Sequence, residues 1–490
     1  MKKYMLAVAL VAAMGILVQG ACSGPGFQER IVPATGTLAV FGGDAAQCSV
    51  ISFTVTITAL TLTPQSGSSP VSVLPSGTAV RVDYASLMDF VTMLSLSNVS
   101  PGTYTSLGIT LANPQLTYLD TSATPPSLKT ITPAMTTLTV NLDFTPTITI
   151  PSAGSLALQL DFNLLNSVAV GTNNQFTVTP TFTANVASAS GGNSLAQFDD
   201  LSGLVQSVST SSTNPAFAGS FNISSPNAPT FTVNVTNSTS YVGASGLSGL
   251  AAGTFVEMSA FLDTNANIVA STVVAEAQEN AASGEAAFAG LITSVSPPSG
   301  SAAQFTLLVQ EENPDVSSRV ALFSLLTVNI APSSTTFGFA SPVANFTNFL
   351  FGPSNLAVGQ RVVVHGTLTN GPGTAQSATA RSVFLGLQSI LGNLSTNPST
   401  PVNIASDGVD GGFTLAPCSP LLQAMPVTVL ASQSTTYEGL AGLSSLTSPG
   451  THFLLAKGLL FYQQSTTSFG VESWVVPAEV QVAAEVHQLP

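Results

Sequence analysis

Few residues of this chain could perform acid–base or metal chemistry, and they are widely spaced. The histidines are His365, His452 and His487. A histidine that acts as a general acid or base needs a partner within hydrogen-bond reach, and zinc needs several ligands at characteristic spacings. The sequence contains no HExxH, GxSxG or GK[ST] motif and no CxxC pair. We therefore predict no catalytic residue, no metal site and no cofactor, and we interpret the histidines as structural.

Acidic residues are scarce enough to be considered one cluster at a time. DTNAN, which starts at Asp263, and DGVDGG, which starts at Asp407, have some likeness to oxygen-rich calcium loops. Both lack the later bidentate Glu of an EF-hand, so hairpin turns are the simpler interpretation. An unrecognised envelope hydrolase stays open as an alternative, because paired carboxylates need not be close in sequence.

The first residues of the chain are typical of a secretory signal peptide. MKKYMLAVALVAAMGILVQGAC has two lysines, then an apolar run from Tyr4 to Val18, then small residues. The run is too short and wrongly flanked for a lasting membrane span. We predict that residues 1–22 direct export and that residues 23–34 form a flexible tether.

Cys22 is the candidate lipidation site. Gly20-Ala21-Cys22 is similar to the end of a bacterial lipobox, in which the cysteine thiol takes a diacylglycerol and becomes a membrane anchor. Gln19 departs from this pattern, because an aliphatic residue is usual there. Cleavage by an ordinary signal peptidase after Gly20 or Ala21 is the competing interpretation.

The remaining cysteines, Cys48 and Cys418, leave two possibilities open. An oxidising compartment would allow them to form a disulfide, although they fall in different predicted domains. Two separate thiols that pack as small apolar residues are the alternative.

The composition narrows the class of partner. Charged residues are 7% of the chain and hydrophobic residues 44%, so Ser, Thr, Asn, Gln and Gly must supply most of the solvated surface. The 23 Asp plus Glu exceed the 9 Lys plus Arg, and no basic run exists that could neutralise phosphates. We therefore expect no nucleic-acid partner.

Alternating apolar residues predict strands in the first domain. FTVTIT at residues 53–58 places Phe53, Val55 and Ile57 on one face, and the apolar phase shifts after Ala59, which indicates a bulge. Similar runs follow, separated by Gly, Pro, Asn and Ser turns. This pattern predicts an antiparallel β-sandwich over residues 35–187. The helical spacing in YASLMDFVTMLS predicts one short helix there.

The same stretch resembles a known bacterial family. TGTLAVFGGDAAQCSVISFTVTITALTL, PGTYTSLGITL from Pro101 and LQLDFNLLNSV from Leu158 are similar to the family called domain of unknown function 4382. The resemblance implies an exported all-β domain and supplies no catalytic residues.

The rest of the chain repeats itself three times. GLVQSVS starts at Gly203, GLITSVS at Gly290 and GLQSIL at Gly386, and each is followed by one phrase: FTVNVTNSTSY, LTVNIAPSSTTF or VTVLASQSTTY. Each unit then continues with a Gly-containing turn, a strand and a short closing strand. Landmarks that recur in fixed order indicate a duplicated module, here a small β-barrel.

The aromatic residue that ends each phrase is Tyr241, Phe337 or Tyr437. We interpret these aromatics as plugs of the barrel cores. Their use as exposed stacking platforms for a ligand is the alternative.

The repeats resemble the bacterial family called domain of unknown function 5666. That resemblance implies small, closed or nearly closed barrels of the oligonucleotide- and oligosaccharide-binding type. The third unit departs most, because it contains the insertion ASDGVDGGFTLAPCSPLLQAM. The whole prediction is an all-β protein with an N-terminal antiparallel β-sandwich followed by three OB-like β-barrel repeats. The predicted segments are the sandwich at 35–187, a linker at 188–202 and barrels at 203–280, 290–385 and 386–490.

The function expected from these observations is non-catalytic. We expect a cell-envelope lipoprotein that is anchored through Cys22 in the outer membrane or the periplasm and has a structural, adhesive or binding role. Its partners would be the membrane and an envelope polysaccharide or protein. A secreted or surface-exposed carbohydrate-binding protein is the first alternative, and it would use the three aromatics.

Overall fold

The computed structural model divides into two units, Met1–Ala34 and Thr35–Pro490, and all described residues belong to the second unit. The description covers residues 35–477 except for these positions: 46, 76, 89, 125, 172–174, 188–193, 226–227, 276–283, 298–300, 313–318, 341–350, 370–376, 396–408, 423–425, 433–434, 436, 438–439, 447–452 and 464–472. The predicted signal peptide, Cys22 and the tether therefore lie outside the described residues, as do His452 and His487.

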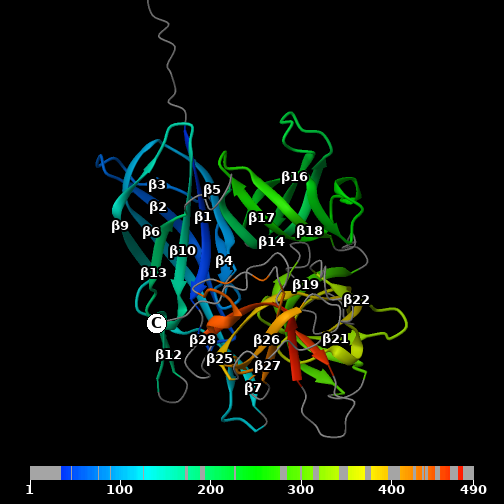
Figure 1. Ribbon diagram of the computed structural model, residues 1–490. Coiled ribbons are helices and arrows are strands. Elements are labelled where there is room, and N and C mark those ends of the chain that lie inside the picture. The colour runs from blue at the N-terminus through cyan, green and yellow to red at the C-terminus, as the bar shows by residue number, and fades with distance from the viewer. Residues whose placement is uncertain are drawn as a thin grey trace, which may run out of the picture. The chain divides into compact units, whose positions relative to one another are not determined.

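The described chain is all-β, as predicted. Figure 1 shows the first domain in blue to teal, and its elements form two main sheets and one small sheet. The elements are β1 (Gly36–Ala45), β2 (Ser52–Pro64), β3 (Val71–Ser72), β4 (Val80–Asp83), β5 (Thr92–Val99), β6 (Gly102–Asp120), β7 (Ser127–Ile131), β8 (Ala134–Met135), β9 (Thr139–Ile150), β10 (Ser155–Asn163), α2 (Leu164–Ser167), β11 (Val168–Val170), β12 (Phe176–Val178) and β13 (Phe182–Val186).

The two main sheets of this domain enclose its core. One sheet has the order β13-β10-β1-β5, and the other has β3-β2-β6-β7 with β4 on β2 and β9 on β6. Aromatic rings fill the space between them: Phe162 stacks on Phe53 at 5.3 Å and on Tyr84 at 4.7 Å between ring centroids. The pairing is antiparallel except for β1 with β10 and β8 with β12, which are parallel.

Two local predictions for the sandwich had different outcomes. The bulge in β2 is confirmed, because its register with β6 shifts between Ile57 and Ala59. The short helix is wrong. Residues 84–87 form turns and β5 begins at Thr92. The ladder of β5 with β1 determines the conformation there, and it overrides the helical spacing of the apolar residues.

The first barrel is closed, in the order β14-β15-β16-β18-β17. Its elements are β14 (Ser194–Ser209), β15 (Gly219–Ser225), β16 (Ala228–Val242), η2 (Leu247–Gly249), β17 (Phe255–Asp263) and β18 (Ile268–Ala275). The strand β14 begins inside the stretch predicted as a linker, because residues 194–204 pair with β17.

The second barrel has the order β21-β20-β19-β23-β24, and the pairing of β21 with β24 closes it. Its elements are β19 (Glu285–Ser296), β20 (Gln304–Glu312), β21 (Leu325–Ile330), β22 (Thr336–Phe339), η5 (Pro353–Asn355), β23 (Arg361–Thr369) and β24 (Ser377–Leu385). The strand β19 starts before the predicted boundary at residue 290. Gly290 is required within it, because an added Cβ would lie 1.9 Å from the Leu308 carbonyl oxygen.

The third unit has the sheet order β28-β25-β26-β27-β30-β29. Its elements are β25 (Leu387–Leu394), β26 (Val409–Pro417), β27 (Val427–Ser432), η6 (Leu443–Ser445), β28 (Phe453–Leu459), β29 (Phe461–Gln463) and β30 (Ser473–Pro477). Only Leu460 separates β28 from β29, so the strands follow the same circuit as in the other two barrels.

The repeated phrase has a common structural role. It lies in β16 in the first barrel and in β21 and β22 in the second, and its first residues form β27 in the third. Each time it pairs in parallel with the closing strand, which is β18, β24 or β30. The Thr239 hydroxyl donates to the Ala270 carbonyl at 2.8 Å, and the Thr335 hydroxyl donates to the Ala380 carbonyl at 2.8 Å. Thr435 is buried at the corresponding place. The threonine therefore clamps the phrase to the closing strand.

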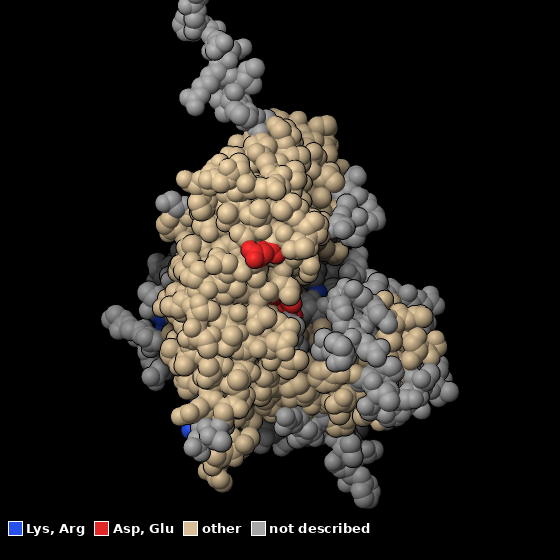
Figure 2. Space-filling model, turned by 90° about the vertical axis from the view of Figure 1, so that its left-hand side faces the viewer, with Lys and Arg blue, Asp and Glu red and all other residues tan. Residues whose placement is uncertain are grey.

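The surface is nearly uncharged on the face drawn in Figure 2, where acidic and basic side chains occupy only small areas of the described residues. No helix in the described part of the chain is long and apolar enough to cross a membrane.

Candidate functional site

The three predicted binding aromatics lie in separate barrels. Tyr241, Phe337 and Tyr437 are each partly buried, and each packs against a hydrophobic core cluster of its own barrel. The Phe337 ring also meets Phe351 edge to face at 5.7 Å between centroids. This packing favours the interpretation as core plugs over exposed stacking platforms.

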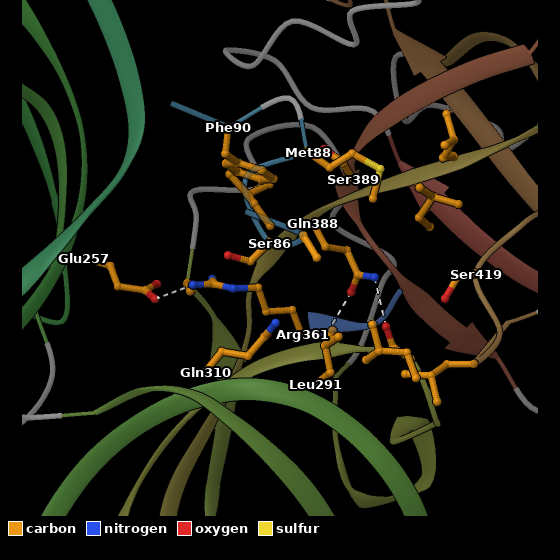
Figure 3. Close-up of a pocket in the computed structure, with 18 of the residues that line it drawn as sticks. Ser86, Met88, Phe90, Glu257, Leu291, Gln310, Arg361, Gln388, Ser389 and Ser419 are labelled. Atoms are coloured by element: carbon orange, nitrogen blue, oxygen red, sulfur yellow. Dashed lines mark hydrogen bonds and ion pairs between the residues drawn. The ribbon is translucent and has the colours of Figure 1, made fainter. Parts of the chain in front are cut away.

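A different site lies among the described residues of the second unit. It is a cavity of about 550 Å³ (Figure 3). The sandwich contributes the loop after β1 and the turn after β4, and each of the three barrels contributes part of the wall. Segments that are hundreds of residues apart in sequence therefore form one enclosure.

A charged pair stands in one wall of the cavity. Arg361, at the start of β23, places one guanidinium nitrogen 3.2 Å from Glu257 of the first barrel and 2.6 Å from Glu311 of the second. The Ser202 hydroxyl donates to the other oxygen of Glu311 at 3.0 Å. Burial raises the pKa of Glu257, and the repulsion from Glu311 adds to this effect while Arg361 opposes it. The ion pairs therefore join the first barrel to the second.

A buried carboxylate joins the sandwich to the second barrel. Asp83, at the end of β4, accepts hydrogen bonds from the backbone N–H of Phe53 at 2.8 Å and from that of Ala85 at 3.2 Å. The Gln310 amide, which lines the cavity, donates to its second oxygen at 3.1 Å. Burial raises the pKa of Asp83, while these hydrogen bonds act in the opposite direction.

Side-chain amides satisfy backbone groups where the second barrel meets the third. Gln388 accepts from the Arg361 backbone N–H at 2.7 Å and donates to the Gly359 carbonyl at 2.9 Å. The Gln360 side chain accepts from the Ala357 backbone N–H at 2.7 Å and donates to the Leu460 carbonyl at 2.9 Å. These uncharged side chains connect the second barrel to the third through hydrogen bonds alone.

Cys48 and Cys418 form a disulfide, which resolves the alternative that the sequence left open. Their Cα atoms are 5.2 Å apart, within the usual range for a disulfide. Both residues line the cavity. Close by, the Lys457 ammonium lies 4.2 Å from the centroid of the Phe90 ring. The bond and this contact join the sandwich to the third barrel.

The predicted structural histidine that the structure describes is buried in the second barrel. His365 is 1% exposed, lies in β23 and is not among the residues that line the cavity. Among the described residues, no group of three or more His, Cys, Asp or Glu side chains could hold a metal ion.

The sequence contained only a weak signal of this site. Arg361 follows Gly359 by two residues, and the corresponding position holds Phe255 in the first repeat and His452 in the third. Because the residue type changes from repeat to repeat, this position does not by itself indicate a site. Its partners Glu257 and Glu311 are 104 and 50 residues away, and no local pattern indicates them.

The comparisons with known proteins support the two resemblances. Residues 35–180 match the family model described as Domain of unknown function (DUF4382), and residues 202–274 match the model described as Domain of unknown function (DUF5666). No curated protein matches the chain. A solved structure titled "drosophila Unr CSD456" matches at 11% identity, covering 59% of this chain and 97% of that one, with a TM-score of 0.14.

Proposed function

We propose that this chain is an exported protein of the cell envelope, anchored in a membrane through Cys22, with a non-catalytic structural, adhesive or binding role. In this proposal the sandwich and the barrels form one assembly that a short tether holds near the membrane. The partners would be an envelope polysaccharide or another envelope protein.

The observation that carries the proposal is the disulfide between Cys48 and Cys418. Structural disulfides form and persist in oxidising compartments and are rare in the cytosol, so the bond supports export independently of the first 22 residues. It also joins the first domain to the last, as expected for a part that must keep its shape outside the cell.

The cavity supports a binding role more than a catalytic one. The ionisable side chains among its described lining residues are Glu257 and Arg361, and they pair with one another. These two groups do not form a nucleophile with an adjacent base. The partly buried aromatics weigh against the alternative of a carbohydrate-binding protein that stacks sugars on Tyr241, Phe337 and Tyr437.

The test is metabolic labelling of cells with a fatty-acid analogue, followed by membrane fractionation. We expect the native protein to carry the label and to sediment with membranes, and Cys22→Ala to lose both properties. The double variant Cys48→Ser/Cys418→Ser is the control, because it removes the other two cysteines together, leaves no unpaired thiol and should keep the label. An unlabelled, soluble native protein would refute the anchor and favour secretion.

A further inference from the structure

We propose that the cavity binds an uncharged amphiphilic small molecule, whose hydroxyl or amide groups face the first barrel and whose apolar part faces the third. This inference goes beyond the proposed role in the envelope. It does not depend on the anchor at Cys22, because the described residues of the second unit alone form the cavity.

The size of the cavity suits such a ligand. Small-molecule sites typically have volumes of roughly 300–1,000 Å³ and combine an apolar lining with a few placed polar groups. The volume here, about 550 Å³, falls within that range. Four hydroxyl-bearing residues of the lining come from the first barrel, and the large apolar side chains are concentrated on the third barrel and the sandwich, although the third barrel also contributes Gln388, Ser389 and Ser419.

The first barrel supplies a wall of hydroxyl groups. Ser240, Ser259, Ser271 and Thr272 line the cavity from β16, β17 and β18. The Ser271 hydroxyl donates to the Ser259 carbonyl at 3.0 Å, and the hydroxyls of Ser240 and Thr272 are 3.0 Å apart. A hydroxyl has one donor and two acceptor positions, so each retains capacity to accept from a hydroxyl or amide of a ligand.

The third barrel and the sandwich supply most of the large apolar side chains of the lining, beside the polar Gln388, Ser389 and Ser419 of the third barrel. Ile390 is 2% exposed, Leu391 is 4% exposed and Leu422 is 3% exposed, and all three line the cavity. Met88 and Phe90 of the sandwich line the same region. Burying an apolar chain against this wall would contribute about 25 cal/mol for each Å² removed from water.

The charges in the cavity argue against an ionised ligand. Figure 3 shows Arg361 and Glu257 directed toward one another, and Arg361 also pairs with Glu311. An anionic group would be repelled by the two carboxylates, Glu257 and Glu311, that already pair with Arg361. A cationic group would compete with Arg361 for Glu257 and leave Arg361, which is partly buried, with one partner fewer, which is costly. An uncharged head group avoids that cost.

The test is fluorescence titration of the purified, disulfide-bonded protein with N-phenylnaphthylamine, an uncharged probe that brightens in apolar sites. The bound probe is then displaced with three compounds that share a ten-carbon chain: monodecanoylglycerol, decanoate and decylamine. We expect saturable binding of the probe and displacement by monodecanoylglycerol. Decanoate and decylamine should require concentrations about tenfold higher or more, a difference of about 1.4 kcal/mol.

Two variants place a large side chain in the cavity. Ser419→Trp and Gln197→Trp change residues that line it from the third and first barrels, and both should weaken probe binding about tenfold. Ser211→Trp is the matched control, because Ser211 is exposed and does not line the cavity. Circular dichroism and a thiol assay establish that each variant is folded and disulfide-bonded. The variant at position 197 tests the proposal if the one at 419 does not fold.

Three results would overturn the proposal. The first is the absence of saturable probe binding to the native protein. The second is native-like binding by folded variants at both 419 and 197. The third is displacement by decanoate or decylamine as effective as that by monodecanoylglycerol.

Discussion

At the scale of single residues, the sandwich core contains a tyrosine whose ring and hydroxyl have different effects on stability. The Tyr84 ring stacks on Phe162, whereas its buried hydroxyl has no hydrogen-bond partner among the described residues. Burial, with the carboxylates of Asp44 and Asp161, raises the pKa of Tyr84. A buried hydroxyl without a partner loses its hydration and gains nothing in exchange.

We therefore predict that Tyr84→Phe leaves stability unchanged or raises it, by up to about 1–3 kcal/mol. Tyr104→Phe is the matched control in the same domain, because the Tyr104 hydroxyl donates to the Ser100 carbonyl at 2.6 Å. It should lower stability by about 0.5–1.5 kcal/mol. Guanidinium unfolding of both variants measures the difference, and a clear loss for Tyr84→Phe would contradict the prediction.

The buried His365 gives the second barrel a dependence on pH. Burial lowers the pKa of His365 below its ordinary value of 6.5; Arg381 adds to this effect and Glu285 opposes it. Between the lowered pKa and 6.5 the unfolded chain binds more protons than the folded chain, so stability falls as the pH falls through that window. Above it the contribution is fully present.

The corresponding experiment compares the native protein with His365→Gln by guanidinium unfolding from pH 8 down to pH 5. The difference in unfolding free energy should be constant above about pH 7 and should change below about pH 6.5, where only the native protein loses this contribution. If the unfolding free energies of the two proteins differed by the same amount at every pH, the pKa of His365 would be the same in the folded and the unfolded chain.

At the scale of elements, the repeated phrase is held by a threonine and not only by its alternating apolar residues. The Thr335 hydroxyl accepts from the Ala331 backbone N–H at 3.0 Å and donates to the Ala380 carbonyl. It thereby satisfies backbone groups where β21 gives way to β22. The same arrangement around Thr239 explains why the module keeps its Thr-rich turn.

Thr335→Val should therefore lower stability by about 1–3 kcal/mol, because valine fills the space but leaves the buried Ala380 carbonyl and the partly buried Ala331 N–H without this partner. Thr336→Val is the control next to it, since the Thr336 hydroxyl is exposed and its loss should change stability by no more than about 0.5 kcal/mol. Equal effects of the two substitutions would show that the clamp does not contribute.

The elements also show what the sequence could predict. Alternation identified the strand at Phe53 and its bulge, and the recurring landmarks identified the barrels, because both signals are local. The turn after Asp83 was predicted as a helix, since the bond from Gln310 and the pairing of β5 with β1 lie far away in sequence. The cavity was not predicted for the same reason.

At the scale of the whole molecule, a few contacts between domains act together. The disulfide joins the sandwich to the third barrel, Asp83 with Gln310 joins it to the second, and the stacking of Phe41 on Phe198 at 5.5 Å joins it to the first. Of these residues, the two cysteines and Gln310 line the cavity. Loss of one of them should therefore affect ligand binding as well as stability.

Removal of the disulfide should lower the free energy of unfolding, measured with guanidinium, by about 2–5 kcal/mol, because the bond restricts the unfolded chain. The measurement compares the native protein with and without a phosphine reductant. The double variant Cys48→Ser/Cys418→Ser should match the reduced protein and should not respond to the reductant. A native protein equally stable in both conditions would show that the noncovalent contacts suffice.

The same bond determines how the chain would carry a mechanical load. A pull applied between residue 35 and a point after Cys418 passes from Cys48 to Cys418 through two sulfur atoms, so the chain segment between these cysteines, at a sequence separation of 370, bears no tension. At about 3.5 Å per residue, the slack that is held back is on the order of 1,300 Å. Under a stretching force the oxidised protein would therefore extend much less than the reduced protein.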